Sequence, residues 1–487
     1  MKKMIVALLA VVVVLSGTPA LAAVYTDLPG DNWAAASVSQ AGEYGLMNGQ
    51  GEGLFGFGKT ITKAEFATIL CNMFHWNLTK PAAASFEDVA AASWYYGYVE
   101  TALAHDVMDK SAAFQPNTPI TRGEMAAMLV RALGLKEAAK LAQNLPLPFA
   151  DVTANQGYIG VAYDIGMING VAADQFAPAN FAKREEAAAM LVRVYQKYTA
   201  KMSFVHGFYA ISAYAQKELA AQMDAVTYSW SAMTVDQNKG VWLNTSSSAN
   251  GNQYRIPQGY ESITAYLEQQ GVKTHLGVFM SQNTRELLLS PENRATAVAA
   301  IIGELTVDYQ MIGKNPYSGV TIDFEGLRGS EVKAGFTAFL TALKQQLTPL
   351  GKSLYVAVQP KVATGSYFDG FDYQAIGNLA DKVILMAHDY QPTSLAGYEG
   401  TTWQKNAPLT PISQVYYALK AAVDPVSGVA DRNKLVFAVS FAAVGWPTDA
   451  AGKLSAATPV RTDSAGVAAL LAAGNPGGFS QVYRNPY

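Results

Sequence analysis

The sequence predicts a multidomain protein: an all-α array of three repeats, followed by an α/β domain, a (β/α)8 barrel that is incomplete at its eighth strand. Two observations predict this. A pair of short markers recurs three times within the first 200 residues, which is typical of a repeat architecture. In the rest of the 487-residue chain, short β-branched or aromatic runs alternate with helical runs, as in a parallel sheet with crossover helices.

Residues 1–22 have the pattern of a secretory signal peptide. Lys2 and Lys3 precede an apolar run over residues 4–15, and the small residues Ala20 and Ala22 fit a signal peptidase site. A transmembrane anchor is disfavoured because the run is too short to span a bilayer. We therefore expect an exported protein that has no membrane segment once the signal is cleaved.

The composition excludes some classes of partner. Lysine and arginine total 35 against 38 acidic residues, a net charge of −3, so no basic field is available for nucleic acid or anionic lipid. The single cysteine, Cys71, cannot form an internal disulfide, so packing alone must hold this exported chain. Cys71 lies in an apolar helical pattern, and we expect it to be a buried core residue.

The first repeat marker is a helix start at residues 61, 120 and 181, where each copy opens a stretch rich in alanine, methionine and leucine. Thr62 and Thr121 are placed to cap the first two helices. The second marker is an aromatic residue followed two positions later by an aspartate: Tyr25 and Asp27, Phe86 and Asp88, Phe149 and Asp151. Between the markers lie an aromatic helix residue and a phenylalanine after a turn: Trp33 and Phe55, Trp94 and Phe114, Tyr158 and Phe176.

These markers resemble the S-layer homology (SLH) domain, in three copies at residues 24–80, 84–140 and 147–198. The resemblance implies a helical three-lobed unit that binds secondary cell-wall polymer. It also implies that the basic residue of each helix start faces an anionic sugar: Lys63, Arg122 and Lys183. A cation beside a helix N-terminus attracts carboxylate, although each could equally be a solvated first-turn charge. The third copy departs most from the motif.

The barrel domain, residues 203–487, contains seven candidate strands: 204–209, 225–230, 273–279, 319–324, 354–359, 382–387 and 435–441. Helical segments fall between them at 294–303, 331–346 and 414–423. Repeated βα units favour a closed barrel over an open sheet. An eighth strand is needed for closure, and the chain ends where that strand is expected. We expect a truncated product; the alternatives are a seven-stranded barrel or a partner that supplies the strand.

Two acids end the fourth candidate strand. Side chains alternate along a strand, so one face carries Val320, Ile322 and Phe324 and the other carries Thr321, Asp323 and Glu325. We expect the apolar set to pack under the barrel helices and the polar set to face the barrel axis. Asp323 and Glu325 then lie ~7 Å apart at Cα, at the strand end where catalytic residues gather. At that range one acid raises the pKa of the other.

This stretch resembles the DGxDxDxE signature of family 18 glycoside hydrolases. Ser318 and Thr321 replace the first two aspartates, while Asp323 and Glu325 are kept. The resemblance implies that Glu325 is the catalytic acid and that Asp323 orients the substrate's 2-acetamido group, whose oxygen attacks the anomeric carbon. The spore-cortex and peptidoglycan-lytic branch tolerates a polar non-acid at the Thr321 position. Losing the second aspartate removes a partner that would help Asp323 hold or release its proton.

Residues 385–390 resemble the family's MxYD element at the end of the sixth strand. His388 stands where the family has tyrosine, and either His388 or Tyr390 would donate a hydrogen bond to the acetamido group. Asp389 is kept, and by the resemblance it would hold the acetamido nitrogen or a sugar hydroxyl. Gln359 ends the fifth candidate strand. If side chains alternate along this strand, Gln359 faces the mouth of the barrel, the end at which Asp323 and Glu325 lie.

Four aromatic residues at or just after strand ends are candidates for stacking on sugar: Tyr209, Trp230, Trp403 and Trp446. Each could instead belong to the core or the rim, since aromatic residues are common in barrel mouths. No His/Asp cluster with metal-ligand spacing lies near the two acids, so we expect neither a metal nor a cofactor.

These patterns together predict a secreted, wall-anchored glycoside hydrolase that cleaves β-1,4-linked N-acetylglucosamine polymer, either peptidoglycan or chitin-like. The alternative is a non-catalytic carbohydrate-binding or structural wall protein with a decayed site, marked by Ser318, Thr321 and His388. Retention of both Asp323 and Glu325 favours the enzyme, because a site under no constraint is expected to lose its acid first.

Overall fold

The computed structural model describes residues 25–28, 30–236, 238–245, 262–310, 312–475, 479–480 and 485–486. The chain divides into two compact units, Met1–Ala200 and Lys201–Tyr487. The signal peptide lies outside the described residues and stays a prediction. Among the helices of these ranges, none is long and apolar enough to cross a membrane.

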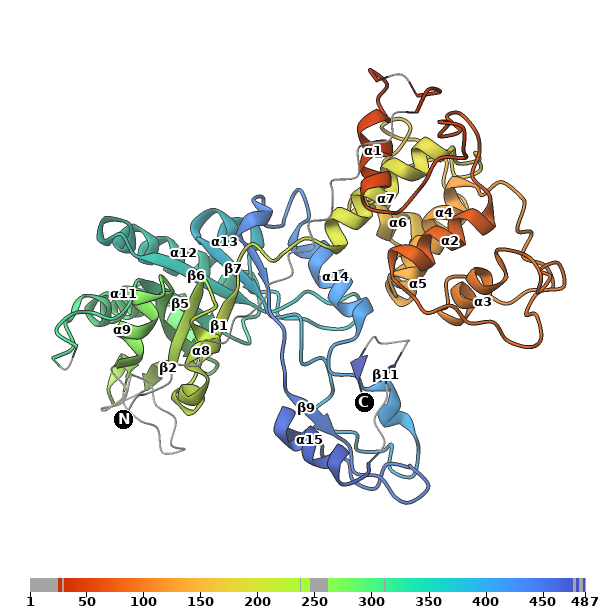
Figure 1. Cartoon of the computed structure of the whole chain (residues 1–487). Coiled ribbons are helices and arrows are strands. Elements are labelled where there is room, and N and C mark those ends of the chain that lie inside the picture. Colours follow the sequence, from red (N-terminus) through yellow and green to blue (C-terminus); the bar gives the residue numbers. More distant parts are fainter. Residues whose placement is uncertain are drawn as a thin grey trace, which may run out of the picture. The chain divides into compact units, whose positions relative to one another are not determined.

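The first unit is all-α (Figure 1). Its helices are α1 (Ala35–Glu43), α2 (Lys63–Met73), α3 (Tyr96–Ala104), α4 (Arg122–Ala132), α5 (Lys136–Ala142), α6 (Gln156–Asp164) and α7 (Arg184–Tyr198). Thr62 and Thr121 form capping boxes with Glu65 and Glu124, so the predicted caps are confirmed. Cys71 is buried, as expected, and burial raises the pKa of its thiol to about 12.

The three repeats meet in a closed ring of backbone hydrogen bonds. The Ile61 N–H donates to the Ala182 carbonyl (3.1 Å), Ala182 donates to Ile120 (2.9 Å), and Ile120 donates back to Ile61 (2.9 Å). Each of these residues lies just before the N-cap of α2, α4 or α7. The helix-start marker therefore joins the repeats as well as opening the helices.

The second marker holds a turn within each repeat. The Oδ1 atoms of Asp27, Asp88 and Asp151 accept hydrogen bonds from the N–H groups of Phe55 (2.8 Å), Phe114 (2.8 Å) and Phe176 (2.9 Å). All three phenylalanine rings are buried. The carboxylate thus stabilises the turn that places each ring in the core, which explains why the aspartate and the phenylalanine recur together.

The second unit is built on a sheet of seven parallel strands in the order β1-β2-β4-β5-β6-β7-β8. Their bounds are β1 (His206–Tyr209), β2 (Ala225–Asp236), β4 (Lys273–Met280), β5 (Gly319–Phe324), β6 (Ser353–Val358), β7 (Lys382–Leu385) and β8 (Leu435–Phe437). All seven candidate strands are confirmed. Because neighbours run parallel, their C-terminal ends meet at one rim.

One strand was not predicted. β3 (Gly240–Asn244) pairs antiparallel with the second half of β2, which continues to Asp236 rather than ending at residue 230. The connecting turn is held by the Asp236 carboxylate, which accepts from the N–H groups of Asn238 (2.8 Å) and Lys239 (2.6 Å). Gly240 follows with a φ of 67°, which favours glycine. The Asn-Lys-Gly sequence was the available signal for this hairpin.

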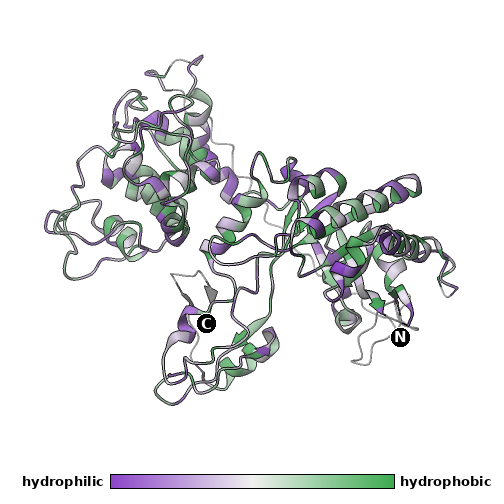
Figure 2. Cartoon of the chain, turned by 180° about the vertical axis from the view of Figure 1, so that it is seen from behind, coloured by the Kyte–Doolittle hydropathy of each residue, from purple (hydrophilic) through white to green (hydrophobic). Residues whose placement is uncertain are grey.

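Helices and short 3₁₀ turns connect the strands: η1 (Ile211–Gln216), α8 (Lys217–Ala220), α9 (Ser262–Gln269), α10 (Thr284–Leu289), α11 (Pro291–Thr306), α12 (Ser330–Leu347), η2 (Thr348–Leu350), α13 (Tyr373–Leu379), α14 (Ile412–Ala422) and η4 (Arg432–Lys434). The apolar face of β5 packs beneath α12 as expected. The Phe324 ring lies 5.8 Å from Phe336 and 5.3 Å from Phe339. Figure 2 shows apolar colour along the central strands and mixed colour on the helices.

The sheet is open between its two end strands. Within the described residues, β1 and β8 do not pair with each other. Phe437, Val439 and Phe441 are exposed beside this opening, Phe441 by 85%. The expectation of a barrel that is incomplete at its eighth strand is therefore confirmed.

A small lobe follows β7. It contains η3 (Trp403–Asn406), α15 (Ser464–Ala472) and the antiparallel pair β9 (Ala443–Gly445) and β10 (Val460–Thr462). A second short pair joins β11 (Phe479–Ser480) to β12 (Asn485–Pro486). The lobe has its own apolar cluster of Leu395, Ala407 and Leu454, separate from the main core of the barrel.

Candidate active site

The interior of the barrel carries a row of hydrogen-bonded polar side chains, which we call the floor. Thr227 of β2 lies 2.7 Å from Thr321 of β5, oxygen to oxygen, although β4 separates these strands in the sheet. The contact therefore crosses the concave face. His206 Nε2 lies 2.7 Å from Thr227, while His275 lies 3.2 Å from Thr321 through Nδ1 and 2.7 Å from Ser353 through Nε2.

Both floor histidines are held neutral. Burial lowers the pKa of His206 to about 4, and burial also lowers the pKa of His275 well below its ordinary value. Sequence reasoning did not single out either histidine. It treated Thr321 as a lost aspartate, whereas the threonine side chain is the central member of this uncharged network.

Asp323 lies one layer above Thr321, on the same interior face of β5. It is 7% exposed, and its Oδ1 atom is buried with no hydrogen-bond partner among the described residues. Burial, and then the charge of Glu325, raise the pKa of the Asp323 carboxyl to about 7. The carboxyl therefore keeps its proton at pH values where an ordinary aspartate has lost it.

Glu325 follows the last residue of β5 and still keeps the register of the sheet, because its N–H donates to the Met280 carbonyl (2.8 Å). Burial raises the pKa of Glu325, His388 lowers it and Asp389 raises it. The sequence predicts that one acid raises the pKa of the other, and in the structure it is Glu325 that raises the pKa of Asp323. The two acids are best treated as one coupled pair.

Gln359 supports the turn that carries Glu325. Its side-chain Oε1 accepts a hydrogen bond from the Gly326 N–H (2.7 Å), and its own carbonyl accepts one from the Tyr373 hydroxyl (2.6 Å). Gly326 has a φ of 73°, so a side chain there would strain the turn. Gln359 thus lies at the mouth of the barrel, as the alternation of side chains predicts. Its amide oxygen already accepts a hydrogen bond from the backbone N–H of Gly326.

His388, Asp389 and Tyr390 follow β7 at the same rim. His388 Nδ1 lies 3.2 Å from Asp389 Oδ2, close enough for an ion pair but without hydrogen-bond alignment. Asp389 adopts a φ of 58°, a left-handed conformation that costs energy in a residue with a side chain. The Tyr390 hydroxyl is buried without a hydrogen-bond partner among the described residues, and burial raises its pKa.

The sheet register corrects the assignment of Tyr209. Tyr209 pairs with Tyr228, and Phe208 pairs with Thr227, whose side chain faces the interior. Tyr209 therefore points outward, where it is 7% exposed in the main core and contacts the Tyr228 ring at 6.2 Å. A ring covered in this way has no free face for a sugar. The ring of β1 that faces the interior is Phe208, which is 36% exposed.

The two later tryptophans lie in the small lobe. Trp403 stacks on Tyr398 at 4.5 Å, and both Trp403 and Trp446 pack against the lobe's apolar cluster while staying partly exposed. Their role as sugar-stacking rings stays a prediction. Trp230 lies within β2, but its side chain is outside what the structure describes.

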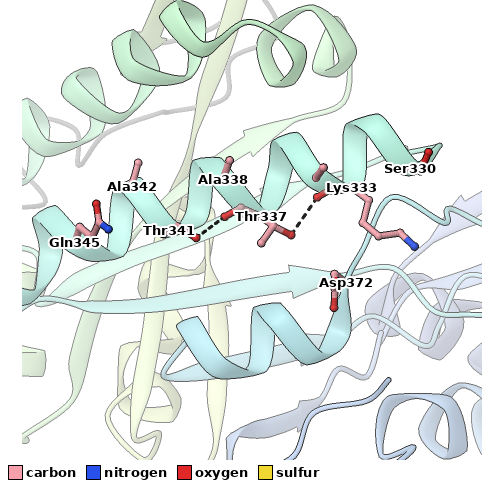
Figure 3. A pocket seen from close by; sticks show the side chains of 9 residues that line it. Ser330, Lys333, Thr337, Ala338, Thr341, Ala342, Gln345 and Asp372 are labelled. Atoms are coloured by element: carbon pink, nitrogen blue, oxygen red, sulfur yellow. Dashed lines mark hydrogen bonds between the residues drawn. The ribbon is translucent and has the colours of Figure 1, made fainter. Parts of the chain in front are cut away.

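A surface hollow of the barrel unit lies elsewhere. About 600 Å³ in volume, it runs along the outer face of α12, where Thr337 and Thr341 donate hydrogen bonds to their own helix (Figure 3). None of the predicted site residues lines it. Across the described part of the chain, no group of three or more His, Cys, Asp or Glu side chains gathers as a metal site.

The helix-start cations of the first unit lie between repeats. The Lys63 ammonium forms an ion pair with Glu124 of the next repeat (2.8 Å). Arg122 stacks on the Phe176 ring at 4.8 Å, and its Nε donates to the Phe176 carbonyl (3.0 Å). Both side chains are largely covered, so they are inter-repeat contacts rather than solvated first-turn charges.

In the third repeat the equivalent cation is Arg184, not Lys183. Helix α7 begins at Arg184, and Lys183 occupies the N-cap, where the other repeats have threonine. Arg184 stacks on Phe55 at 5.1 Å, and its Nε donates to the Phe55 carbonyl (2.9 Å), which repeats the geometry of Arg122. The sequence alignment placed the third motif one residue too early, because Glu186 rather than Glu185 completes the capping box.

Comparisons with known protein families agree with this organisation. Residues 197–475 match Glycosyl hydrolases family 18, and residues 24–67 and 85–126 match the S-layer homology domain. The family match to the SLH domain covers the first two repeats; membership of residues 147–198 stays a prediction.

Similar curated proteins include surface-layer proteins. The chain is 27% identical to an S-layer protein of Bacillus thuringiensis subsp. finitimus over 39% of this chain and 23% of that protein. It is 27% identical to the S-layer protein sap of Bacillus anthracis over 41% of this chain and 24% of that protein. The chain thus matches about a quarter of the length of these two relatives.

Two solved structures resemble the chain at low identity. The C-terminal domain of a putative chitinase from Desulfitobacterium hafniense is 21% identical, with a TM-score of 0.43, over 58% of this chain and 79% of that one. The spore cortex-lytic enzyme SleL of Bacillus cereus is 18% identical, with a TM-score of 0.42, over 59% of this chain and 62% of that one.

Proposed function

The chain belongs to glycosyl hydrolase family 18, and from this membership we propose that it is a wall-anchored hydrolase of β-1,4-linked N-acetylglucosamine polymer. The observation that carries the proposal is the pair of acids at the interior end of β5. Asp323 is buried and its carboxyl has a pKa of about 7, beside Glu325, whose pKa is also raised. A coupled pair of this kind can hold and deliver one proton near neutral pH.

In the proposed mechanism Glu325 protonates the leaving glycosidic oxygen. The substrate's own 2-acetamido oxygen attacks the anomeric carbon, so no enzyme nucleophile is required. Asp323, whose buried Oδ1 has no hydrogen-bond partner within the described residues, accepts a hydrogen bond from the acetamido N–H and orients the group. Glu325, deprotonated after the first step, then takes a proton from the water that opens the cyclic intermediate.

The neighbouring residues of the rim support these roles. His388 and Asp389 are the charged groups that act on Glu325, one lowering its pKa and the other raising it. Gln359 fixes the turn after Glu325 through the Gly326 N–H. The buried Tyr390 hydroxyl, which lacks a partner among the described residues, is available to bind a sugar or acetamido oxygen.

The SLH repeats form the second half of the proposal. Surface-layer relatives and the SLH family match support anchoring to secondary cell-wall polymer, with Lys63 and Arg122 as contacts to its anionic sugars. Arg184 takes the place that the sequence assigned to Lys183. The protein would then be secreted and would act on polysaccharide close to its anchoring site.

The decisive test of the enzyme is Glu325→Gln in the full chain. Glutamine keeps the shape of the side chain but cannot give up a proton, so hydrolysis of N-acetylglucosamine oligomers should fall by ~10²- to 10⁴-fold while oligomer binding is retained. Glu331→Gln is the matched control, because Glu331 is an exposed glutamate of α12 that pairs with Arg285 at the surface. Equal rates for Glu325→Gln and the parent would favour a non-catalytic binding domain, the reading consistent with the changes at Ser318 and Thr321.

Anchoring is tested separately by sedimentation of the full chain with purified cell walls. Lys63→Ala with Arg122→Ala should reduce the bound fraction, and removal of the anionic secondary polymer from the walls should abolish binding. Lys140→Ala is the control, since Lys140 is an exposed lysine that pairs within its own helix. Unchanged binding to stripped walls would contradict the anchoring proposal and leave the enzyme proposal intact.

A further inference from the structure

The first unit contains a hollow of about 490 Å³ that neither proposed role uses. It lies at the C-terminal ends of α1 and α2, beside α7, which packs along α1 (Figure 1). Its lining is largely aromatic and polar: Tyr44, Gly45, Leu46, Cys71, Asn72, Met73, His75, Trp76 and Tyr195. The helix-start cations are at the opposite ends of the helices, so this hollow is distinct from the predicted polymer contacts.

The repeats differ at a position that lines the hollow. Asn72 is the tenth residue of α2, and the tenth residues of α4 and α7 are Arg131 and Arg193. α2 and α4 have the same length and the same threonine capping box, so their tenth residues point in the same direction. Repeats 2 and 3 therefore carry an arginine where repeat 1 carries the much shorter asparagine.

Both arginines donate to the turn after the preceding helix, at carbonyls that are one position apart when the repeats are aligned. Arg131 Nε donates to the Asp106 carbonyl (2.7 Å), and Arg193 Nε donates to the Met167 carbonyl (3.2 Å). Each carbonyl belongs to the turn that follows the preceding helix, α3 or α6. Arg131 also pairs with Asp106 and Asp109, but Arg193 makes no ion pair among the described residues. Carbonyl oxygens are thus sufficient to hold a guanidinium group in this place.

In repeat 1 the corresponding turn is Gly45 and Leu46, and it lines the hollow. No group in the described ranges donates a hydrogen bond to the carbonyl oxygen of either residue. Asn72 is exposed and makes no side-chain hydrogen bond within the same residues. The acceptors are therefore present without the guanidinium that satisfies them in the sister repeats.

The walls of the hollow suit a cation. Tyr44 and Tyr195 stack on each other at 4.7 Å, which leaves one face of each ring outside the pair. Trp76 stacks on both His105 of the next repeat (3.9 Å) and Phe74 (5.2 Å). Neither lysine nor arginine lines the space. Aromatic rings attract guanidinium and ammonium groups, and carbonyl oxygens accept their N–H bonds.

We propose that this hollow binds a small organic cation, a guanidinium or primary ammonium group on a ligand, in the place that Arg131 and Arg193 fill in the other repeats. The site is independent of the proposed hydrolase. Its affinity for a minimal group should be weak, on the order of millimolar, because such a ligand has few atoms to contribute.

The test is calorimetric titration of the full chain with methylguanidinium chloride, and separately with N-acetylglucosamine as the neutral alternative. Methylguanidinium should bind, and Asn72→Arg should weaken that binding at least tenfold because the new side chain fills the hollow. Asn72→Ala, which leaves the hollow open, should bind as the parent does. Glu325→Gln should also bind normally, which separates this site from the barrel.

A second measurement tests whether the arginine of Asn72→Arg fits the hollow or only blocks access of the ligand to it. If the hollow matches an arginine, Asn72→Arg should raise the Tm of the first unit by making the hydrogen bond that Arg131 and Arg193 make. The proposal is overturned if Asn72→Arg lowers the Tm, if N-acetylglucosamine binds and methylguanidinium does not, or if neither probe binds.

Discussion

Buried polar groups on the floor of the barrel have hydrogen-bond partners, whereas several at its mouth have none among the described residues. The floor side chains bond to one another across five strands: His206, Thr227, His275, Thr321 and Ser353. At the mouth, Asp323 Oδ1, Tyr390 Oη and Gln391 Oε1 are buried without hydrogen-bond partners among the described residues.

This difference indicates that the two layers have different roles. A buried polar atom without a partner costs ~1–3 kcal/mol, whereas a satisfied network contributes to stability and specificity. The floor therefore holds the strands together, and the unpaired groups of the mouth are the ones that the proposed function assigns to a ligand. The two layers also differ in charge, because the pKa values of the floor histidines are lowered while those of Asp323 and Glu325 are raised.

Among the predictions that compare the two layers, the largest effect is expected at the mouth. Asp323→Asn should reduce hydrolysis of N-acetylglucosamine oligomers by ~10²- to 10³-fold, the usual loss when one group that stabilises transition-state charge is removed. Initial rates at matched protein concentration measure it. A rate within twofold of the parent would show that the comparison assigns catalysis to the wrong layer.

The same substitution should stabilise the fold, with a dependence on pH that can be worked out. The Asp323 pKa is raised from 3.8 to about 7, so above pH 4 the unfolded chain loses a proton that the folded protein keeps. Stability from this group is thus lost as pH rises from 4 to 7. At pH 8, Asp323→Asn should gain up to a few kcal/mol, since one pKa unit corresponds to ~1.4 kcal/mol. Urea unfolding at pH 4 and pH 8 measures it; equal gains at both would contradict this account.

The stability that the floor histidines contribute should depend on pH in the opposite direction. His206 and His275 have lowered pKa values, so below pH 6.5 the unfolded chain takes up protons that the folded protein does not. Their contribution to stability is lost as pH falls from 6.5 towards 4. His275→Gln should cost ~1–3 kcal/mol at pH 7.5 and flatten this acid dependence, while turnover by the folded fraction is retained. His75→Gln, at an exposed residue, is the control.

The smallest effect is expected at Tyr390. Tyr390→Phe removes a buried hydroxyl that has no hydrogen-bond partner within the described residues, so the free protein should be unchanged or more stable by up to ~1 kcal/mol. Oligomer binding should weaken several-fold if the hydroxyl serves the ligand. Thermal unfolding with and without the oligomer measures both; a clear loss of stability without ligand would show that the hydroxyl is structural.

Much of this protein follows from local sequence pattern. The seven strands, the threonine caps, the apolar face of β5 and the placement of Asp323 and Glu325 on its interior face were all predictable. Each depends on a period of two in a strand, or on a capping motif within one helical turn. Such signals are contained in a few consecutive residues, so a single sequence carries them.

Tertiary structure alone decided the features that depend on pairing between distant segments. The sequence assigned Tyr209 and Lys183 to functional faces, and in both cases the residue in that place is the neighbour, Phe208 or Arg184. An error of one residue reverses the face of a strand and rotates a helical side chain by about 100°. The register that removes this ambiguity is set by the partner strand or the adjoining repeat. The floor network likewise exists only once five strands are aligned, because its members are far apart in the sequence.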